Sequence, residues 1–269
     1  PLLNSEPYSH KPPLLFWFIQ LGWSVFGVNE LWPRLLPALF SLATVVLTWR
    51  VGARLFPQRP GVGLLAGTML LGSLLWGVFT PALMFDLLLS FWVLLATYGL
   101  MCAANGRAMS GWTLVAFATG LGLLAKGPVV LLYTVPLALL VPLGGQHPPA
   151  LRWYACLAAA LLAGTAIALA WAIPAAMRGG PDYAKAIFWS QSADRMVDSF
   201  AHRRPLWWYL PLLPLLLFPW LCWPVLWRGL ARLLRRPEPA ARKVAELQRR
   251  DIPVAHIGKH HGGFHFSGR

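Results

Sequence analysis

Residues 61–104 read GVGLLAGTMLLGSLLWGVFTPALMFDLLLSFWVLLATYGLMCAA, an almost uninterrupted apolar run. As a single helix this run would be about 66 Å long at 1.5 Å per residue, twice the hydrocarbon core of a bilayer. The run must therefore turn back on itself. Thr80-Pro81 is the natural place, because proline lacks the amide donor that continues a helix. The stretch predicts two antiparallel membrane spans, 61–80 and 84–104.

The composition of the whole chain agrees with a membrane protein. Of its 269 residues, 57% are apolar and only 12% are charged, whereas a soluble domain carries about a quarter charged residues. A second long run, 112–144, is broken by Lys126-Gly127-Pro128. The apolar runs long enough to consider are 35–49, 61–80, 84–104, 112–125, 128–144, 153–175 and 206–227. We expect an all-α integral membrane protein, a multi-span helical bundle with about seven spans plus interfacial helices.

The basic residues predict how the spans are oriented. We place the short apolar run 14–28 along the membrane surface as an interfacial helix. One set of loops then receives Arg50, Arg54, Arg59, Arg107, Arg152, Arg228, Arg232, Arg235 and Arg236. By the positive-inside rule that side is cytoplasmic. The outer side receives His10-Lys11, Asp86, Lys126 and the loop 176–205, so the isolated polar groups share one face.

The formal charge of +14 is concentrated toward the C-terminal end of the sequence. We expect residues 1–227 to form a multi-span membrane domain. Residues 228–269 are expected to form a basic linker and the start of a soluble α/β domain. A basic tail suits nucleic acid or an anionic lipid surface, but no nucleic-acid motif is present. Membrane lipids are therefore the expected partner.

Four short motifs occur in a characteristic order. They are Tyr8-Ser-His-Lys-Pro-Pro13, Phe85-Asp86, Ala125-Lys126-Gly127-Pro128 and His202-Arg203-Arg204-Pro205-x-Trp-Trp-Tyr209. Together they resemble bacterial polyprenyl-phosphate-dependent glycosyltransferases of the GT-C type, such as lipid A aminoarabinose transferases and relatives of protein O-mannosyltransferases. The resemblance covers nearly all of residues 1–227. It implies transfer of a sugar from an undecaprenyl-phosphate-type donor to a lipid or protein acceptor, at the outer face of the bacterial cytoplasmic (inner) membrane.

The resemblance also implies which residues bind the donor. Lys11 and Lys126 match lysines near the donor phosphate, where a cation stabilises the charge of the leaving group. Arg203 or Arg204 would add forked donors suited to phosphate. Tyr8 matches an aromatic residue of the same loop as Lys11.

Other matches concern acids and a metal ion. Asp86 resembles a supporting carboxylate of the cavity, while the presumed catalytic carboxylate of the family would lie upstream of Pro1. His202 matches a histidine that is associated with a divalent metal ion in some members, and His10 would be its partner ligand. His10 also stands where aminoarabinose transferases carry an acid. No other cofactor is implied.

Simpler interpretations stay open at this stage. Lys126 could simply end a helix and extend its ammonium toward the membrane surface. Arg203 and Arg204 could be a solvated pair, and Asp86 could cap the helix that follows it. Two other function classes also remain. A lipid-linked substrate transporter or flippase would use outer-face cations, although its inverted repeats are not found. An inactive fragment of the transferase is the third, because of the carboxylate expected upstream of Pro1.

Overall fold

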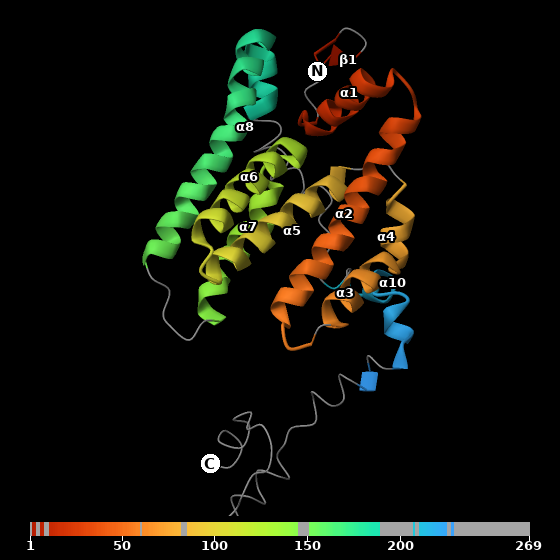
Figure 1. The fold of residues 1–269 in the computed structure, drawn as a ribbon. Coiled ribbons are helices and arrows are strands. Elements are labelled where there is room, and N and C mark those ends of the chain that lie inside the picture. The colour runs from red at the N-terminus through yellow and green to blue at the C-terminus, as the bar shows by residue number, and fades with distance from the viewer. Residues whose placement is uncertain are drawn as a thin grey trace, which may run out of the picture. The chain divides into compact units, whose positions relative to one another are not determined.

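The computed structural model describes residues 11–59, 61–81, 85–144, 151–188, 207, 210–224 and 227–228, together with the backbone of 2–3 and 6–7. The chain forms two compact units, Pro1–Leu216 and Leu217–Arg269. The first unit contains a two-residue hairpin of β1 (Leu2–Leu3) and β2 (Glu6–Pro7). Its α-helices are α1 (Leu14–Phe26), α2 (Leu31–Leu55), α3 (Gly61–Leu71), α4 (Leu74–Phe79), α5 (Phe85–Ala104), α6 (Ala108–Lys126), α7 (Val129–Leu140), α8 (Leu151–Lys185) and α10 (Leu213–Leu216) (Figure 1). A 3-10 helix, η1 (Val141–Gly144), follows α7. The second unit includes the short helix η5 (Trp220–Cys222).

Among the residues that the structure describes, four helices are long and apolar enough to cross a membrane. They are α2, α5, α6 and the helical segment Leu151–Phe188, which contains α8. The expected all-helical membrane architecture is confirmed. Three of the predicted runs do not give such helices among the residues described: 61–80 is divided into α3 and α4, α7 has 12 residues, and α10 in 206–227 has four.

The breaks predicted at prolines lie where the sequence places them. α4 ends at Phe79, just before Thr80-Pro81. α6 ends at Lys126, and Gly127 has a φ of 77°, a left-handed conformation that glycine adopts without steric cost. Pro128 then precedes α7, so the chain reverses directly after Lys126. The sequence did not predict the additional break between α3 and α4, where Ser73 is extended.

Small residues bring neighbouring helices into backbone contact. The closest approaches pair Gly52 with Gly63 between α2 and α3, Gly99 with Gly111 between α5 and α6, and Gly120 with Gly164 between α6 and α8. A Cβ on Gly164 would lie 2.8 Å from the carbonyl oxygen of Ala116. Such seams are typical of helices that associate in lipid, where small residues let backbones approach. In the last seam, Gly164 faces 116–120 while Ile167 faces Gly120, so α6 and α8 run parallel.

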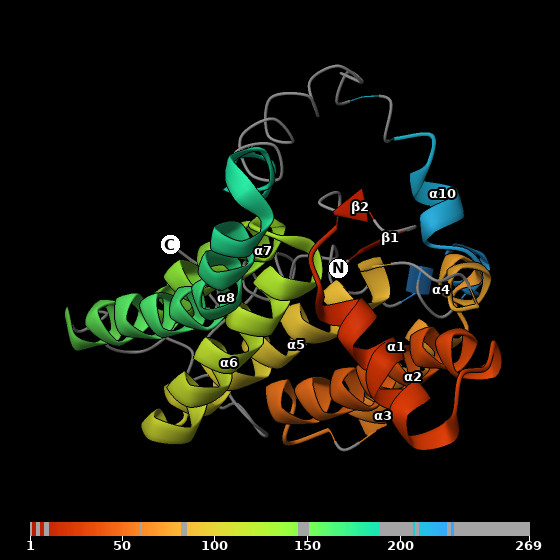
Figure 2. The same ribbon diagram turned by 90° about the horizontal axis from the view of Figure 1, so that it is seen from above.

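The short helix α1 belongs to the main core of the bundle. Its 13 residues span about 20 Å, less than a bilayer core of about 30 Å. Figure 1 shows it at one end of the bundle, beside the start of α2, and Figure 2 views the bundle from that end. Leu14, Leu15 and Ile19 of α1 share this core with buried residues of α2, α5 and α6. These are Leu36, Leu88, Trp92, Ala96, Ala118, Leu124 and Ala125. Its other face is apolar and exposed, at Trp17, Leu21 and Val25.

The sequence prediction of a loop over 176–205 is wrong for its first part. Residues 176–185 continue α8, with a kink at Gly180, whose φ is 83°. Pro181 follows, and proline is well suited to the first turn of a helix. The polar sequence Arg178-Gly-Gly-Pro therefore interrupts the helix at Gly180, and a second helical stretch starts directly at Pro181. Residues 189–205 lie outside the described part of the chain.

The opposite end of the bundle carries the arginines. The end of α2, the α5–α6 turn and the start of α8 lie at this end (Figure 1), and its described residues include Arg50, Arg54, Arg59, Arg107 and Arg152 but neither Asp nor Glu. The guanidinium of Arg54 lies over the ring of Tyr98, 4.3 Å from its centroid, and donates to the sulfur of Cys102 at 2.7 Å. Arg54 thereby ties the end of α2 to α5.

Candidate functional site

Three residues that the sequence predicts for the site lie near the same end of the bundle. Lys11 precedes α1, Asp86 lies in the first turn of α5, and Lys126 is the last residue of α6. Each position has a local cause. Pro12 and Pro13 are buried at the start of α1, α5 begins after the Thr80-Pro81 turn, and Gly127 ends α6 at the lysine.

Asp86 and Lys126 form an ion pair. The ammonium of Lys126 donates a hydrogen bond to Oδ1 of Asp86. The acid is at a helix N-terminus and the base at a helix C-terminus, so each charge is also favoured by the dipole of its own helix. The Asp86 side chain is 63% exposed and the Lys126 side chain 26%. A ligand can therefore reach both groups.

Phe85 connects this pair to Lys11. The ammonium of Lys11 lies 5.4 Å from the centroid of the Phe85 ring, within the range of a cation–π interaction. The same ring meets Phe16 of α1 edge to face at 6.1 Å. Lys11 and Lys126 thus contact consecutive residues, Phe85 and Asp86, at the start of α5.

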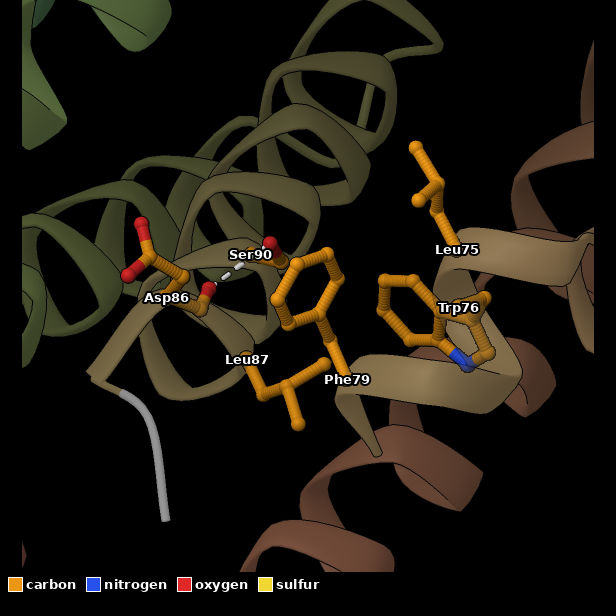
Figure 3. A pocket seen from close by; sticks show the side chains of 6 residues that line it. All are labelled: Leu75, Trp76, Phe79, Asp86, Leu87 and Ser90. Carbon is orange, nitrogen blue, oxygen red and sulfur yellow. Dashed lines mark hydrogen bonds between the residues drawn. The ribbon is translucent and has the colours of Figure 1, made fainter. Parts of the chain in front are cut away.

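An apolar cavity of about 450 Å³ opens beside Asp86. It is lined by side chains of α4 and α5: Leu75, Trp76, Phe79, Asp86, Leu87 and Ser90. Figure 3 shows the ring of Phe79 between Ser90 and Trp76, while the carboxylate of Asp86 points away from Phe79. The hydroxyl of Ser90 donates to the backbone carbonyl of Asp86 at 2.8 Å, so its polar group is satisfied. The cavity therefore offers a hydrocarbon surface with charge at its rim.

The sequence did not single out the cavity residues of α4. Trp76 and Phe79 come just before the Thr80-Pro81 turn, and Asp86 comes just after it. A helical hairpin that turns at Thr80-Pro81 brings these aromatic residues close to Asp86. Their closeness in the sequence could therefore have predicted that they line the same cavity. The predicted role of Phe85 was likewise limited to its place in a motif.

The remaining predicted site residues lie outside the described part of the chain: Tyr8, His10, His202, Arg203 and Arg204. The metal site expected at His10 and His202 therefore stays a prediction. Within the described ranges no group of three or more His, Cys, Asp or Glu side chains is gathered in a way that could hold a metal ion. We derive no chemical step through a metal.

Comparison with known proteins decides the family. Residues 10–171 match the family model described as dolichyl-phosphate-mannose-protein mannosyltransferase. The chain belongs to this family. The matched region contains Lys11, Asp86 and Lys126, and the resemblance indicated by the four motifs is confirmed.

Curated relatives extend the family match. The undecaprenyl phosphate-alpha-4-amino-4-deoxy-L-arabinose arabinosyl transferase of Pseudomonas aeruginosa is 31% identical over 255 residues, which are 93% of this chain and 43% of that protein. The enzyme of the same name from Erwinia tasmaniensis is 31% identical over 221 residues, 79% of this chain and 39% of that protein. This chain spans less than half the length of these relatives. No solved structure matches it.

Proposed function

We propose that this chain is part of a membrane glycosyltransferase that transfers a sugar from a polyprenyl-phosphate donor of the undecaprenyl type to a lipid or protein acceptor. The observation that carries the proposal is the start of α5, where two lysines contact Phe85 and Asp86 beside an apolar cavity. A polyprenyl-phosphate sugar is an amphiphile with an anionic head and a hydrocarbon tail. It requires cations next to an apolar surface, and the names of the relatives point to the same donor class.

The chemistry is a substitution at the anomeric carbon of the sugar. The bond from this carbon to the phosphate oxygen breaks, and an acceptor oxygen forms a new bond to the carbon. The prenyl phosphate leaves with an additional negative charge. The Lys126 ammonium has three N–H donors, one of which is held by Asp86, so two remain for phosphate oxygens. Lys11 supplies a second cation, and charge stabilisation of this kind lowers the barrier to departure.

Asp86 acts in this proposal as a supporting carboxylate. Its bond to Lys126 holds the ammonium beside the start of α5 and occupies one of its own oxygens. The proton of the acceptor is therefore assigned to another base. Arg203 and Arg204 would complete the phosphate site, Tyr8 would line it, and a divalent metal ion on His10 and His202 remains part of the prediction.

The tail of the donor would lie in the α4–α5 cavity. Leu75, Phe79 and Leu87 give it an apolar lining directly next to the charged rim. With the phosphate on Lys126, the first isoprene units would replace water against these side chains. Burial of apolar surface contributes roughly 25 cal/mol per Å². The prenyl tail of the donor would therefore supply most of the binding affinity, and the lysines would supply the specificity for phosphate.

We also propose the placement in the membrane. The arginine-rich end of the bundle would face the cytoplasm, as the positive-inside rule requires, so the site would face the periplasm of a bacterial inner membrane. The runs 61–80, 128–144 and 206–227 would complete about seven spans with the four long helices. Residues 228–269 would continue as the basic linker and the beginning of a soluble domain.

Binding of a short donor analogue tests the proposal. The 269-residue chain is purified in detergent, and its affinities for farnesyl phosphate, farnesol and inorganic phosphate are measured by native mass spectrometry. We expect farnesyl phosphate to bind at least about tenfold more tightly than either part alone. Lys126→Met should weaken farnesyl phosphate by about 10- to 100-fold, the effect of losing one or more charge-assisted hydrogen bonds.

Lys185→Met is the matched control, because Lys185 is an exposed cation near the end of α8. Its affinity for farnesyl phosphate should equal that of the unmodified chain. Equal binding of farnesyl phosphate and farnesol, or an unchanged affinity in Lys126→Met, would contradict the proposal. Transfer of label from a radiolabelled polyprenyl-phosphate sugar in membranes then tests the reaction itself.

A further inference from the structure

A second cavity lies at the corner between α1 and α2, and it shares no lining residue with the α4–α5 cavity. It has a volume of about 610 Å³ and is lined by Trp23, Val28, Asn29, Glu30, Pro33 and Arg34. Three of these side chains are apolar or aromatic, and two carry opposite charges. The proposed sugar transfer uses none of them.

The corner is held in shape by its own hydrogen bonds. Oδ1 of Asn29 accepts from the backbone N–H of Trp32 at 2.8 Å, and Nδ2 of Asn29 donates to the carbonyl of Gly27 at 2.7 Å. The indole N–H of Trp23 donates to the carbonyl of Asn29 at 2.8 Å. Asn29 thereby caps α2 in the manner of an N-terminal Asn. Since the Trp23 ring is fixed to the turn, the wall of the cavity exists before any ligand arrives.

Glu30 and Arg34 form an ion pair at the mouth of this cavity. Nη2 of Arg34 lies 3.0 Å from Oε2 of Glu30, one helical turn away, and the two side chains are 77% and 88% exposed. An exposed pair of this kind contributes about 0–1 kcal/mol to stability. The contact engages one oxygen of the carboxylate and one nitrogen of the guanidinium, so both groups keep capacity for a ligand.

The pair lies at the start of the candidate span α2, away from the arginines at its other end. Arg34 and Arg50 are 16 residues apart on the candidate span α2, or about 24 Å along the helix axis, less than the hydrocarbon core of about 30 Å. With Arg50 at the cytoplasmic boundary, a core of about 30 Å would put the backbone of Arg34 about 6 Å inside the opposite boundary, a depth from which its long side chain can reach the headgroups. Its side chain leans toward the N-terminus of its helix, where it meets Glu30. The large apolar side chains around the corner are exposed: Phe26 65%, Val28 83%, Leu31 66% and Leu35 42%.

We propose that this corner binds a phospholipid with a zwitterionic phosphoethanolamine headgroup. The phosphate lies on the guanidinium of Arg34, the primary ammonium donates to the carboxylate of Glu30, and an acyl chain follows Leu31 and Leu35 along α2. The charges select this lipid class. The Glu30–Arg34 pair is neutral overall and matches one anion and one cation. A phosphoglycerol headgroup offers Glu30 neutral hydroxyls and no cation, and a choline headgroup has no N–H to donate to it.

Native mass spectrometry of the full 269-residue chain tests this assignment. The protein in detergent is titrated separately with 1-palmitoyl-2-oleoyl lipids carrying ethanolamine, glycerol or choline headgroups. One ethanolamine lipid should be retained about tenfold more tightly than the other two, the effect of one charge-assisted hydrogen bond. Arg34→Gln should remove tight retention of all three lipids. Glu30→Gln should remove the preference for ethanolamine and leave phosphate-dependent retention.

The matched control is Arg178→Gln, which removes an exposed guanidinium on α8 outside the cavity and should leave the preference unchanged. Equal retention of the three lipids by the unmodified chain would overturn the proposal. So would retention of the ethanolamine preference in Arg34→Gln, or its loss in Arg178→Gln. Farnesyl phosphate binding in Arg34→Gln should stay unchanged, which separates this site from the proposed donor site.

Discussion

The ammonium of Lys126 and the carboxylate of Asp86 are bonded to each other although 40 residues separate them in the chain. The contact exists because the antiparallel helices α5 and α6 bring the start of one beside the end of the other. Neither residue is an isolated charge in an apolar environment. Each satisfies the other and remains accessible, which is the arrangement expected of a pair that exchanges one partner for a ligand.

The first prediction concerns the strength of this pair. Asp86→Asn, Lys126→Gln and the double variant form a thermodynamic cycle, measured by thermal unfolding in detergent. The coupling free energy should be about 0.2–1 kcal/mol, because the largely exposed carboxylate is screened by solvent. A coupling above about 3 kcal/mol would indicate a buried pair and would contradict the exposure described for Asp86.

The second prediction concerns the α4–α5 cavity. Ser90→Leu places a larger apolar side chain in it and should weaken farnesyl phosphate while leaving the weaker binding of dimethylallyl phosphate nearly unchanged. The loss for the longer chain should be about 10-fold, since each displaced methylene contributes about 0.8 kcal/mol. Isothermal titration calorimetry gives both affinities. The control is Ser110→Leu, at an exposed site near the start of α6. An equal loss of farnesyl phosphate affinity in this control would contradict binding of the prenyl tail in the α4–α5 cavity.

Much of this bundle could be predicted from the sequence, and the reasons are local. Thr80-Pro81 and Lys126-Gly127-Pro128 end helices because a proline or a left-handed glycine leaves no alternative. The break at Gly72-Ser73 contains no proline, and only tertiary packing shows it. The helical residues after Arg178 were missed because a polar sequence was taken as a loop, whereas Gly180 separates two helical stretches that follow each other directly.

The third prediction concerns the packing of α1 on α2. A Cβ on Gly22 would lie 1.7 Å from the indole nitrogen of Trp32, which itself donates to the carbonyl of Phe18 at 2.9 Å. Gly22→Ala must therefore displace the indole, and we expect a loss of about 1–3 kcal/mol, as for other overpacked sites. Unfolding in detergent measures the loss. Gly77→Ala on α4, where a Cβ meets nothing within 4 Å, should leave stability unchanged or slightly higher.

The fourth prediction compares two buried threonines. The hydroxyl of Thr119 is buried without a hydrogen-bond partner in the described structure, whereas the hydroxyl of Thr134 donates to the carbonyl of Val130 at 3.0 Å. Valine has nearly the same shape as threonine. Thr119→Val should raise the free energy of unfolding by about 1–3 kcal/mol, and Thr134→Val should lower it by about 1 kcal/mol. A loss of stability in Thr119→Val, like that expected for Thr134→Val, would show that the hydroxyl of Thr119 has a partner after all.

The candidate site was only partly predictable, for a different reason. Charged residues are conspicuous in an apolar sequence, so Lys11, Asp86 and Lys126 stood out. Trp76 and Phe79 did not, because aromatic residues are ordinary in a chain with 15 tryptophans. Their role depends on which face of α4 turns to α5, and no local pattern encodes that choice.

The parallel seam of Gly120 and Gly164 has a consequence for biosynthesis. α6 leaves the ribosome about 40 residues before the part of α8 that covers it, a delay of about 2–8 s at typical elongation rates. During that interval the bare glycine stripe and the Thr119 hydroxyl face lipid or the insertion machinery. Folding of this half of the bundle therefore waits for α8, and a nascent chain halted before Gly164 should remain susceptible to quality-control proteases.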